Sequence, residues 1–153
     1  MVSRALFSSA SDEWETPPAL FAQLHAEFAF EIDLAASPHN RKLDHWWAKD
    51  DDSLAQTWHD GFARGFCNPP YSRGLQAQFI AKAADERAQG FTTVLLLPAR
   101  TDTRAFHTHL YDAARWRPRE GVELRFLPGR LRFVGAAHGA PFPSMVAILR
   151  GQT

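Results

Sequence analysis

The tetrapeptide Asn68-Pro69-Pro70-Tyr71 brings together a neutral hydrogen-bond acceptor, two rigid residues and an aromatic ring. The side-chain carbonyl of Asn68 is an acceptor, and Pro69 has no N–H and a fixed φ, so its own carbonyl can be aimed rigidly. Two acceptors held close together match the two hydrogens of an NH₂ group, and the ring of Tyr71 offers a surface on which a flat heterocycle can stack. The tetrapeptide therefore predicts a site that prepares an exocyclic amine for attack.

The chemistry favoured by this arrangement is transfer of a methyl group to that amine. Two acceptors at the amine hydrogens favour a more tetrahedral nitrogen and free its lone pair, and the donor must lie in line at short range. One acceptor of this kind is worth roughly 3–4 kcal/mol, by analogy with oxyanion-hole deletions. No strong base is needed, because the proton can leave after transfer. The alternative is structural, since Asn-Pro begins turns and Pro-Pro marks loops.

The elements around the tetrapeptide predict an α/β fold in which strands alternate with helices. Such alternation indicates a mostly parallel sheet with helices on its faces, and final strands without a helix indicate antiparallel C-terminal strands. Asp33, Asn68 and Pro98 then lie at the carboxyl ends of three strands, where α/β sheets bind ligands. We expect helices over 15–30, 74–90 and 101–115, strands over 28–37, 63–67, 91–98, 122–127, 129–135 and 144–150, and mainly loop over 38–61.

Length and composition indicate one domain. The chain has 153 residues, of which 45% are hydrophobic, and we expect residues 1–12 to form a mobile arm and residues 13–153 to form the domain. No apolar run is long enough for a membrane span, and the N-terminus lacks a secretory signal. The single cysteine, Cys67, is expected to be a buried small hydrophobe and fits a reducing cytoplasm.

Charge is distributed unevenly along the chain. Residues 1–97 contain 8 Lys and Arg against 13 Asp and Glu, a net charge of −5. Residues 98–153 contain 9 Arg against 4 Asp and Glu, a net charge of +5. This asymmetry predicts an acidic cofactor end and a basic end that faces phosphates, because arginine suits bidentate contacts to phosphate or guanine.

Seven segments, taken in order, resemble the small phage and prophage DNA N6-adenine methyltransferases. The resemblance implies a reduced Rossmann-like fold that uses S-adenosylmethionine (SAM) to methylate adenine in DNA, within the cytoplasm of a bacterial host. It covers about residues 12–150. The segments are DEWETPPALFAQL, FEIDLAAS, DDSLAQTW, FCNPPYSRG, VLLLPARTDTRAFH, GRLRF and APFPSMVAIL.

The resemblance also implies a cofactor site built from several segments. Asp33 corresponds to the acid that meets the cationic methionine end of the cofactor, and Asn68 is counted among the cofactor-binding residues as well as the catalytic ones. Asp52 and Ser53 correspond to the segment that contacts the adenosine, although Asp50 and Asp51 compete with Asp52. Ala35 belongs to DLAAS, which replaces the glycine-rich turn of larger methyltransferases. Trp14, Thr16 and Pro17 correspond to the motif that holds the amino-acid part of SAM. Thr16 is also a plausible N-cap, and Pro17 fits the first position of the helix that follows.

The short span between Asp33 and Asn68 predicts a sheet with one face partly open. Cofactor binding is then weak or is completed by a partner subunit, so a homodimer is one expectation. Three tryptophans, Trp46, Trp47 and Trp58, are interpreted as core residues, one of which could cover the cofactor. No metal site is expected, because His107 and His109 lie two residues apart on a predicted helix and point to different sides.

The DNA is expected to face residues 98–143. An adenine inside a duplex must be flipped out to reach Tyr71, at a cost of a few kcal/mol that phosphate contacts must offset. The loop 135–143 is a candidate reader of sequence. The candidate DNA-binding residues are Arg100 and Arg104 after the apolar strand, and Arg130, Arg132 and His138 around the last loop.

Three other functions remain open at the level of sequence. The same tetrapeptide could serve methylation of another planar NH₂ group, such as a protein glutamine or an RNA base. The chain could be a catalytically inactive DNA-binding relic of the same fold. It could also be a structural α/β module in which Asn-Pro-Pro is only a turn.

Overall fold

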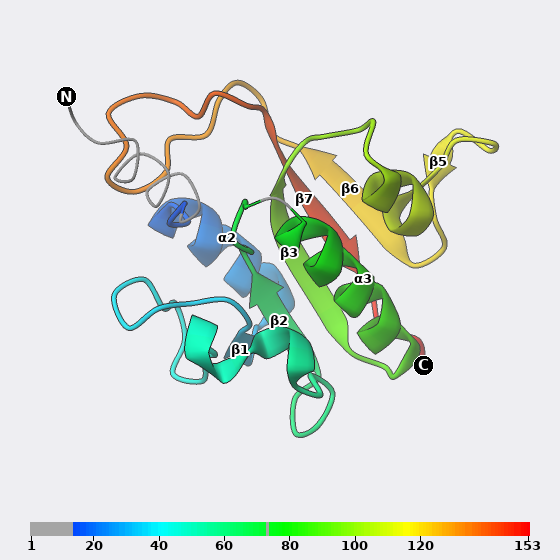
Figure 1. Cartoon of the computed structure of the whole chain (residues 1–153), viewed down its shortest axis with the longest axis horizontal. Coiled ribbons are helices and arrows are strands. Elements are labelled where there is room, and N and C mark those ends of the chain that lie inside the picture. Colours follow the sequence, from blue (N-terminus) through cyan, green and yellow to red (C-terminus); the bar gives the residue numbers. More distant parts are fainter. Residues whose placement is uncertain (1–13, 73) are drawn as a thin grey trace.

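The computed structural model describes residues 14–72 and 74–153, so the arm predicted for residues 1–12 lies outside the described residues. One five-stranded sheet has the strand order β1-β2-β3-β7-β6. The first three strands are parallel, and β7 runs antiparallel to both of its neighbours, which confirms the predicted arrangement. The strands are β1 (Ile32–Asp33), β2 (Arg64–Cys67), β3 (Thr92–Pro98), β6 (Val122–Phe126) and β7 (Ser144–Leu149) (Figure 1).

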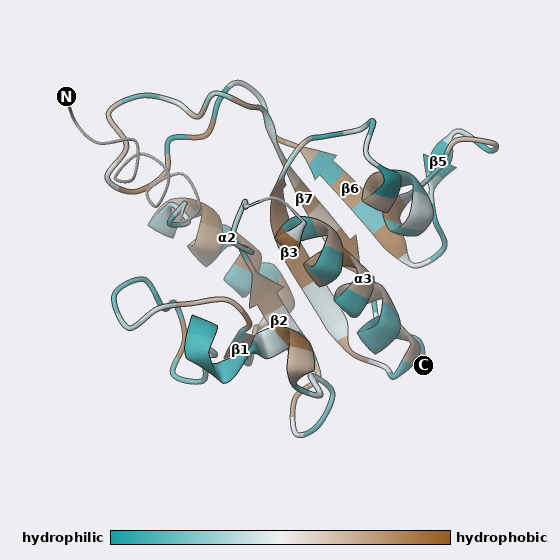
Figure 2. Ribbon diagram, viewed as in Figure 1, coloured by the Kyte–Doolittle hydropathy of each residue, from teal (hydrophilic) through white to brown (hydrophobic). Residues whose placement is uncertain are grey.

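Two helices, one on each face, enclose the sheet. Alternate residues of β3 point to opposite faces: Leu95 and Leu97 pack in the cluster that contains α3 (Leu75–Ala88), whereas Val94 and Leu96 pack in the cluster that contains α2 (Pro18–Phe28). All four side chains are buried, as the continuous apolar run of this strand predicts for a strand covered on both sides. The apolar colouring of β3 and β7 in Figure 2 follows this central position.

Parallel pairing brings the carboxyl ends of β1, β2 and β3 to one edge of the sheet. Asp33 pairs in register with Phe66, and Cys67 pairs with Leu95. Asp33 therefore ends β1 and Asn68 follows β2 on the edge where β3 also ends, as predicted from the sequence. We call this edge the carboxyl edge.

The start of α2 differs from the prediction. The N-cap is Pro17, which has a φ of −58°, and Pro18 occupies the first helical position. Thr16 therefore does not cap the helix, and Pro17 is not its first residue, because the proline that best suits the first turn is the second of the pair. Thr16 is instead buried and directs its hydroxyl toward Asn68.

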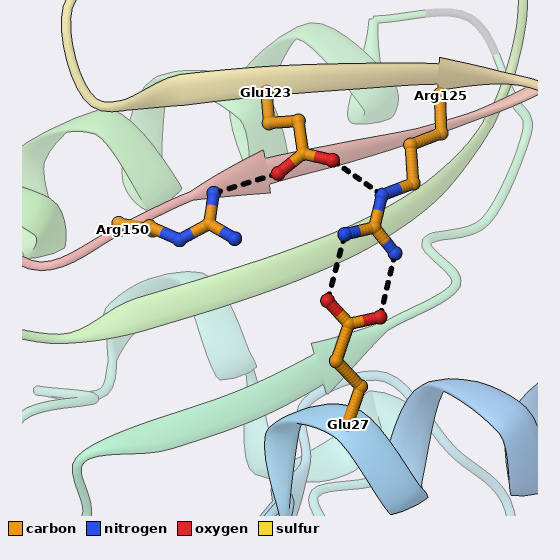
Figure 3. A network of polar contacts seen from close by, with 4 residues as sticks. All are labelled: Glu27, Glu123, Arg125 and Arg150. Atoms are coloured by element: carbon orange, nitrogen blue, oxygen red, sulfur yellow. Dashed lines mark hydrogen bonds and ion pairs between the residues drawn. The ribbon is translucent and has the colours of Figure 1, made fainter.

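A charged network joins α2 to the last strands (Figure 3). Arg125 of β6 donates two hydrogen bonds of 2.7 Å each to the carboxylate of Glu27 on α2. Its Nε donates to Glu123, which also accepts a 2.9 Å hydrogen bond from Arg150. Both carboxylates have pKa values below the usual range, because the Arg125 side chain donates to each of them. The bidentate pair fixes the helix across the face of the sheet.

The predicted helix over 101–115 is present only over residues 104–110. Its last part, Phe106–Leu110, is a π-helical turn, η3, and the chain then enters a two-stranded hairpin made of β4 (Tyr111–Asp112) and β5 (Arg117–Pro118). Phe106 and Leu110, which the helical spacing placed on one apolar face, are both buried. The side chain of Asp112, however, accepts hydrogen bonds from backbone amides and turns the chain back.

The predicted strand over 129–135 is also wrong, because this segment belongs to a long loop over residues 127–143. Gly129 and Gly135 have φ values of +66° and +81°, which bend the chain at both ends of the segment. Phe133 is buried among aromatic side chains, and the amide of Val134 donates to the carbonyl of Glu15. Contacts with the N-terminal segment therefore replace strand pairing.

Candidate functional site

A cavity of about 400 Å³ opens at the carboxyl edge of the sheet. It lies between the ends of β1 and β2, the segment before α2 and the loop that contains the short helical turns η1 (Lys49–Asp51) and η2 (Ser53–Ala55). Of the residues predicted to hold a cofactor, all except Pro17 line this cavity: Trp14, Thr16, Asp33, Ala35, Asp52, Ser53 and Asn68. The structure thus brings together side chains that are far apart in sequence, while their role in binding stays a prediction.

The orientation of the Asn68 amide is fixed by its neighbours. The amide nitrogen donates to the hydroxyl of Thr16 at 3.0 Å and to the carbonyl oxygen of Trp14. Since a carbonyl oxygen accepts but cannot donate, the nitrogen of Asn68 must face Trp14. The side-chain oxygen Oδ1 is then buried, and it has no hydrogen-bond partner among the described residues. A buried acceptor of this kind is costly unless a ligand satisfies it.

Tyr71 points away from this cavity and toward a second one. Its hydroxyl donates to the carbonyl of Leu96 at 3.2 Å, and burial raises the pKa of its phenol above the usual range. Its ring stacks near that of Trp14, with centroids 6.4 Å apart, and meets Phe133 and Phe142 edge-on. Pro69 is buried and Pro70 lines the first cavity, so the tetrapeptide forms a wall between the two spaces.

The second cavity, of about 200 Å³, lies between α3 and the segment after β3. Its lining includes Tyr71, the predicted DNA-binding residue Arg100, and the buried side chains Phe106 and Leu110. Gln76 also lines it, with a buried amide nitrogen that has no partner among the described residues. This space therefore offers an aromatic ring, an unpaired donor and a cation at one edge of the sheet.

Asp33 is a buried acid at the end of β1, only 3% exposed. Its carboxylate accepts hydrogen bonds from the backbone amides of Ala35 at 3.4 Å and Lys42 at 3.1 Å. Burial raises the pKa of Asp33 to about 6, against the lowering effect of these two amides. The group is thus ionised at neutral pH in a cavity wall, where it would attract a cation.

The loop on the other side of the cavity is anchored to α3. The backbone amide of Trp58 donates to the carboxylate of Glu86 at 2.7 Å, and the indole N–H of Trp58 donates to the carbonyl of Ser53 at 2.9 Å. Trp58 is fully buried, as predicted for a core tryptophan, whereas Trp47 lines the cavity. Among the three consecutive aspartates, Asp52 is the one in the cavity wall.

The predicted DNA-binding side chains are all exposed, in two groups. Arg100 and Arg104 follow β3, whereas the other three belong to the loop 127–143, which Figure 1 places at the same edge of the molecule. The Nε of Arg132 donates to the carbonyl of Ala136, which shapes this loop. Nothing in the geometry tests their binding to DNA, so the assignment of Arg100, Arg104, Arg130, Arg132 and His138 stays a prediction.

The sequence analysis missed several residues of the first cavity. Asn40 and Lys42 come from the polar segment 38–61, which has no periodicity that could place them. Lys42 contributes through its backbone amide as well as through an ion pair with Glu15, with a 3.7 Å separation between Nζ and the carboxylate oxygen. The spacing of Leu75 and Phe79 predicted the buried face of a helix, but it did not predict that these side chains would line the first cavity.

Two kinds of feature are absent from residues 14–72 and 74–153. No group of three or more His, Cys, Asp or Glu side chains has the geometry to hold a metal ion, and no helix has the length and apolar character to cross a membrane.

The sequence of this chain matches a family of known proteins. A family model described as DNA N-6-adenine-methyltransferase (Dam) matches residues 4–150. A curated protein of Haemophilus phage HP1 (strain HP1c1), named DNA N-6-adenine-methyltransferase, is 29% identical over 91 residues. That alignment covers 58% of this chain, and the chain spans about half the length of the phage protein.

Proposed function

The chain belongs to the DNA N-6-adenine-methyltransferase (Dam) family, and from this premise we propose that it methylates the N6 amino group of an adenine flipped out of DNA. The observation that carries the proposal is the buried, unpartnered Oδ1 of Asn68 beside the cavity at the carboxyl edge. An acceptor held in this way is suited to an amino group that enters the site from outside.

Asn68 and Pro69 act as the acceptors for the adenine amine. Oδ1 of Asn68 accepts one N–H of the amine, and the carbonyl of Pro69, which belongs to a buried residue with a fixed φ, is assigned to the other. These hydrogen bonds orient the nitrogen lone pair toward the methyl donor. Methyl transfer makes the nitrogen cationic and acidic, and it then releases a proton to water. The hydrogen bonds from Asn68 to Thr16 and Trp14 preorganise its amide, so little reorganisation is required during the reaction.

The first cavity fits SAM in size and in chemistry. Its volume of about 400 Å³ falls in the usual range for small-molecule sites, and its wall includes the acid Asp33 and the partly apolar surfaces of Trp14 and Trp47. When bound, SAM supplies an electrophilic methyl group. Asp33 attracts the cationic end of SAM, and Asp52 and Ser53 contact the adenosine. The hydroxyl of Ser53 is buried and has no hydrogen-bond partner among the described residues, which supports a ligand there.

Tyr71 contributes the stacking surface for the flipped base. Its ring already contacts Trp14, Phe133 and Phe142, so the adenine joins an existing aromatic cluster and the loop 127–143 must adjust when the base enters. Arg100, on the wall of the second cavity, and Arg104, which is exposed, are assigned to the phosphates beside the flipped base. Arg130, Arg132 and His138 are assigned to the DNA on the side of the loop.

The test is transfer of a labelled methyl group from SAM to DNA by the full chain. Duplex and single-stranded DNA are compared with an RNA and with a glutamine-containing peptide, and the product nucleoside is identified after digestion. We expect N6-methyladenine from DNA. Methylation of only the RNA or the peptide would reject DNA as the substrate, and DNA binding without SAM binding by calorimetry would indicate an inactive relic.

A further inference from the structure

The hairpin of β4 and β5 projects from the wall of the second cavity. Phe106 and Leu110 line that cavity together with Tyr71, and Tyr111 then begins the hairpin directly after Leu110. In Figure 1 the hairpin extends beyond the helical turn η3, away from the sheet, and the loop 127–143 lies on the other side of the carboxyl edge. The two projections therefore flank the candidate site.

Hydrogen bonds hold the hairpin in a defined shape. Asp112 pairs with Arg117 across the two strands, and the Asp112 carboxylate accepts the backbone amides of Ala114 and Arg115 at 3.0 and 3.3 Å. At its base, the Arg119 side chain donates to the carbonyl of His107, at 3.0 Å for Nε. The turn is thus fixed at both ends, and it presents its tip at a constant angle to the body of the protein.

The tip presents a tryptophan to solvent. Trp116 is 79% exposed, the largest exposure among the large hydrophobic residues described. Its φ of +56° lies in the left-handed region, which a bulky side chain rarely adopts because of the contact between Cβ and the backbone. An exposed indole held in a strained conformation contributes nothing to a core. Such outliers concentrate at functional sites, where a ligand uses the arrangement.

The charge around the indole is positive. Residues 111–119 contain three arginines and one acid, Asp112. Arg115 is 3.9 Å from the Asp112 carboxylate, yet its side chain remains 69% exposed. Arg117 is exposed, and no hydrogen bond or ion pair of its side chain is found within residues 14–72 and 74–153. An exposed indole between two exposed guanidinium groups is complementary to stacked bases between phosphates, rather than to a purely apolar partner.

We propose that this hairpin is a second DNA-binding element, in which Trp116 inserts against a base step beside the flipped adenine while Arg115 and Arg117 bind the adjacent phosphates. The proposal rests on the proposed function, because it assumes that the target base reaches Tyr71. The two residues of β4 and residues 113–115 of the turn separate Trp116 from Leu110, which lines the second cavity. The indole is therefore close in sequence to the wall of the cavity that Tyr71 also lines. Stacking of the indole would offset part of the cost of flipping.

The test measures binding of a fluorescently labelled duplex of about two helical turns to the full chain by anisotropy, across a salt series. Trp116→Ala is expected to weaken binding roughly tenfold or more, and Trp116→Phe to restore most of it, because stacking requires an aromatic face. Arg117→Ala is expected to weaken binding and to reduce the slope of log Kd against log salt by about 1. Arg64→Ala, which removes the same charge at the start of β2, on the edge of the sheet opposite the carboxyl edge, is the matched control and should leave the slope unchanged.

Trp116→Gly separates binding from folding. Glycine relieves the positive φ, so its Tm should equal or exceed that of the wild type, while its DNA affinity should fall as in Trp116→Ala. If the wild type methylates DNA and all Trp116 variants bind as tightly as it does, the proposal is wrong although the enzyme assignment stands. If the wild type neither binds nor methylates DNA, the enzyme assignment itself fails. The proposal would also be overturned if the Trp116 variants lost binding to anionic vesicles, or lost dimerisation, while their DNA affinity equalled that of the wild type.

Discussion

Asn68 and Thr16 are joined by a 3.0 Å hydrogen bond from the amide nitrogen to the threonine hydroxyl, across 52 positions of sequence. This contact, with the carbonyl of Trp14 on the same nitrogen, turns Oδ1 of Asn68 to the unpartnered position. The segment before α2 thus sets the direction of the acceptor that follows β2. Catalysis and the cofactor site are therefore expected to respond separately to changes in these two residues.

Replacement of Asn68 by alanine should abolish transfer while leaving cofactor binding nearly intact. Removing one preorganised hydrogen-bonding group costs about 2.7–4 kcal/mol of transition-state stabilisation, a loss of roughly 10²–10³ in kcat. Single-turnover methylation measures the rate, and calorimetry with SAM measures the affinity. Gln78→Ala, an amide removed from the exposed side of α3, is the control. A large loss of SAM affinity in Asn68→Ala would instead assign Asn68 to cofactor binding.

Thr16 is expected to act by positioning Asn68. Thr16→Val keeps the shape but removes the hydroxyl acceptor, so one N–H of Asn68 loses its partner at a cost of about 1 kcal/mol. We expect kcat to fall roughly fivefold, and Thr16→Ser, which retains the hydroxyl, to recover it. The KM for SAM and the kcat are measured together. An increase in KM with kcat unchanged would contradict positioning and indicate that Thr16 holds the cofactor directly.

The affinity for SAM should depend on pH through Asp33. Its pKa of about 6 means that the carboxylate is ionised at pH 7.5 and largely protonated at pH 5. A cationic ligand favours the ionised form, so affinity should rise by roughly tenfold per pH unit below about pH 6 and level off above it. Calorimetry between pH 5 and pH 8 gives the profile. In Asp33→Asn the affinity should be low and the profile flat.

The same pKa has the opposite consequence for stability. The folded-state pKa of Asp33 is raised above the reference value of 3.8, so the folded protein binds this proton more tightly than the unfolded chain does. The resulting stabilisation is fully present below about pH 3.8 and is lost as pH rises through about 6. The free energy of unfolding of Asp33→Asn, minus that of the wild type, should therefore be larger at pH 8 than at pH 4. Urea unfolding at both pH values measures this difference, and equal differences would contradict a buried, ionised Asp33.

The carboxyl edge could be predicted from sequence because its signals are local. The run from Val94 to Leu97 is apolar at every position, which requires burial on both faces and hence a central strand. Once three parallel strands are inferred, the residues at their ends must meet, whatever the loops do. Asp33 and Asn68 were found in this way, and the cavity between them follows from the same geometry.

What the sequence could not predict depends on contacts between distant segments. Leu131 and Phe133 alternate with two arginines as in a strand. Phe133, however, packs against Trp14, more than a hundred residues away, with ring centroids 5.2 Å apart. Asp112 lies in a segment whose apolar residues are spaced as in a helix. Its carboxylate, however, accepts a hydrogen bond from the backbone amide of Ala114, and the chain reverses there. Lys42 donates to Asp33 through its backbone amide. Because nearly every residue has such an amide, the type of side chain at this position could not predict the contact.

Glu86 is expected to support cofactor binding from outside the cavity. This buried carboxylate on α3 accepts the backbone amide of Trp58 at 2.7 Å, contacts Nδ1 of His59 at 2.6 Å and lies 3.4 Å from the Lys82 ammonium. Burial raises its pKa, but the contacts from His59, Trp58 and Lys82 outweigh that effect and hold the pKa below 4.5. Through Trp58, whose indole donates to Ser53, Glu86 fixes one wall of the cavity.

Glu86→Gln should therefore weaken both folding and SAM binding. The amide nitrogen of glutamine faces donors that require an acceptor, so the free energy of unfolding should fall by about 1–3 kcal/mol. SAM affinity should fall several-fold while kcat at saturating SAM changes little, because the loop of Ser53 loosens but Asn68 is untouched. The depressed pKa also means that this stabilisation is lost in the wild type as pH falls below 4.5. Asp85→Asn, an exposed neighbour on α3, is the control. A loss of stability with unchanged SAM affinity would show that the contact between Glu86 and Trp58 does not affect the cofactor site.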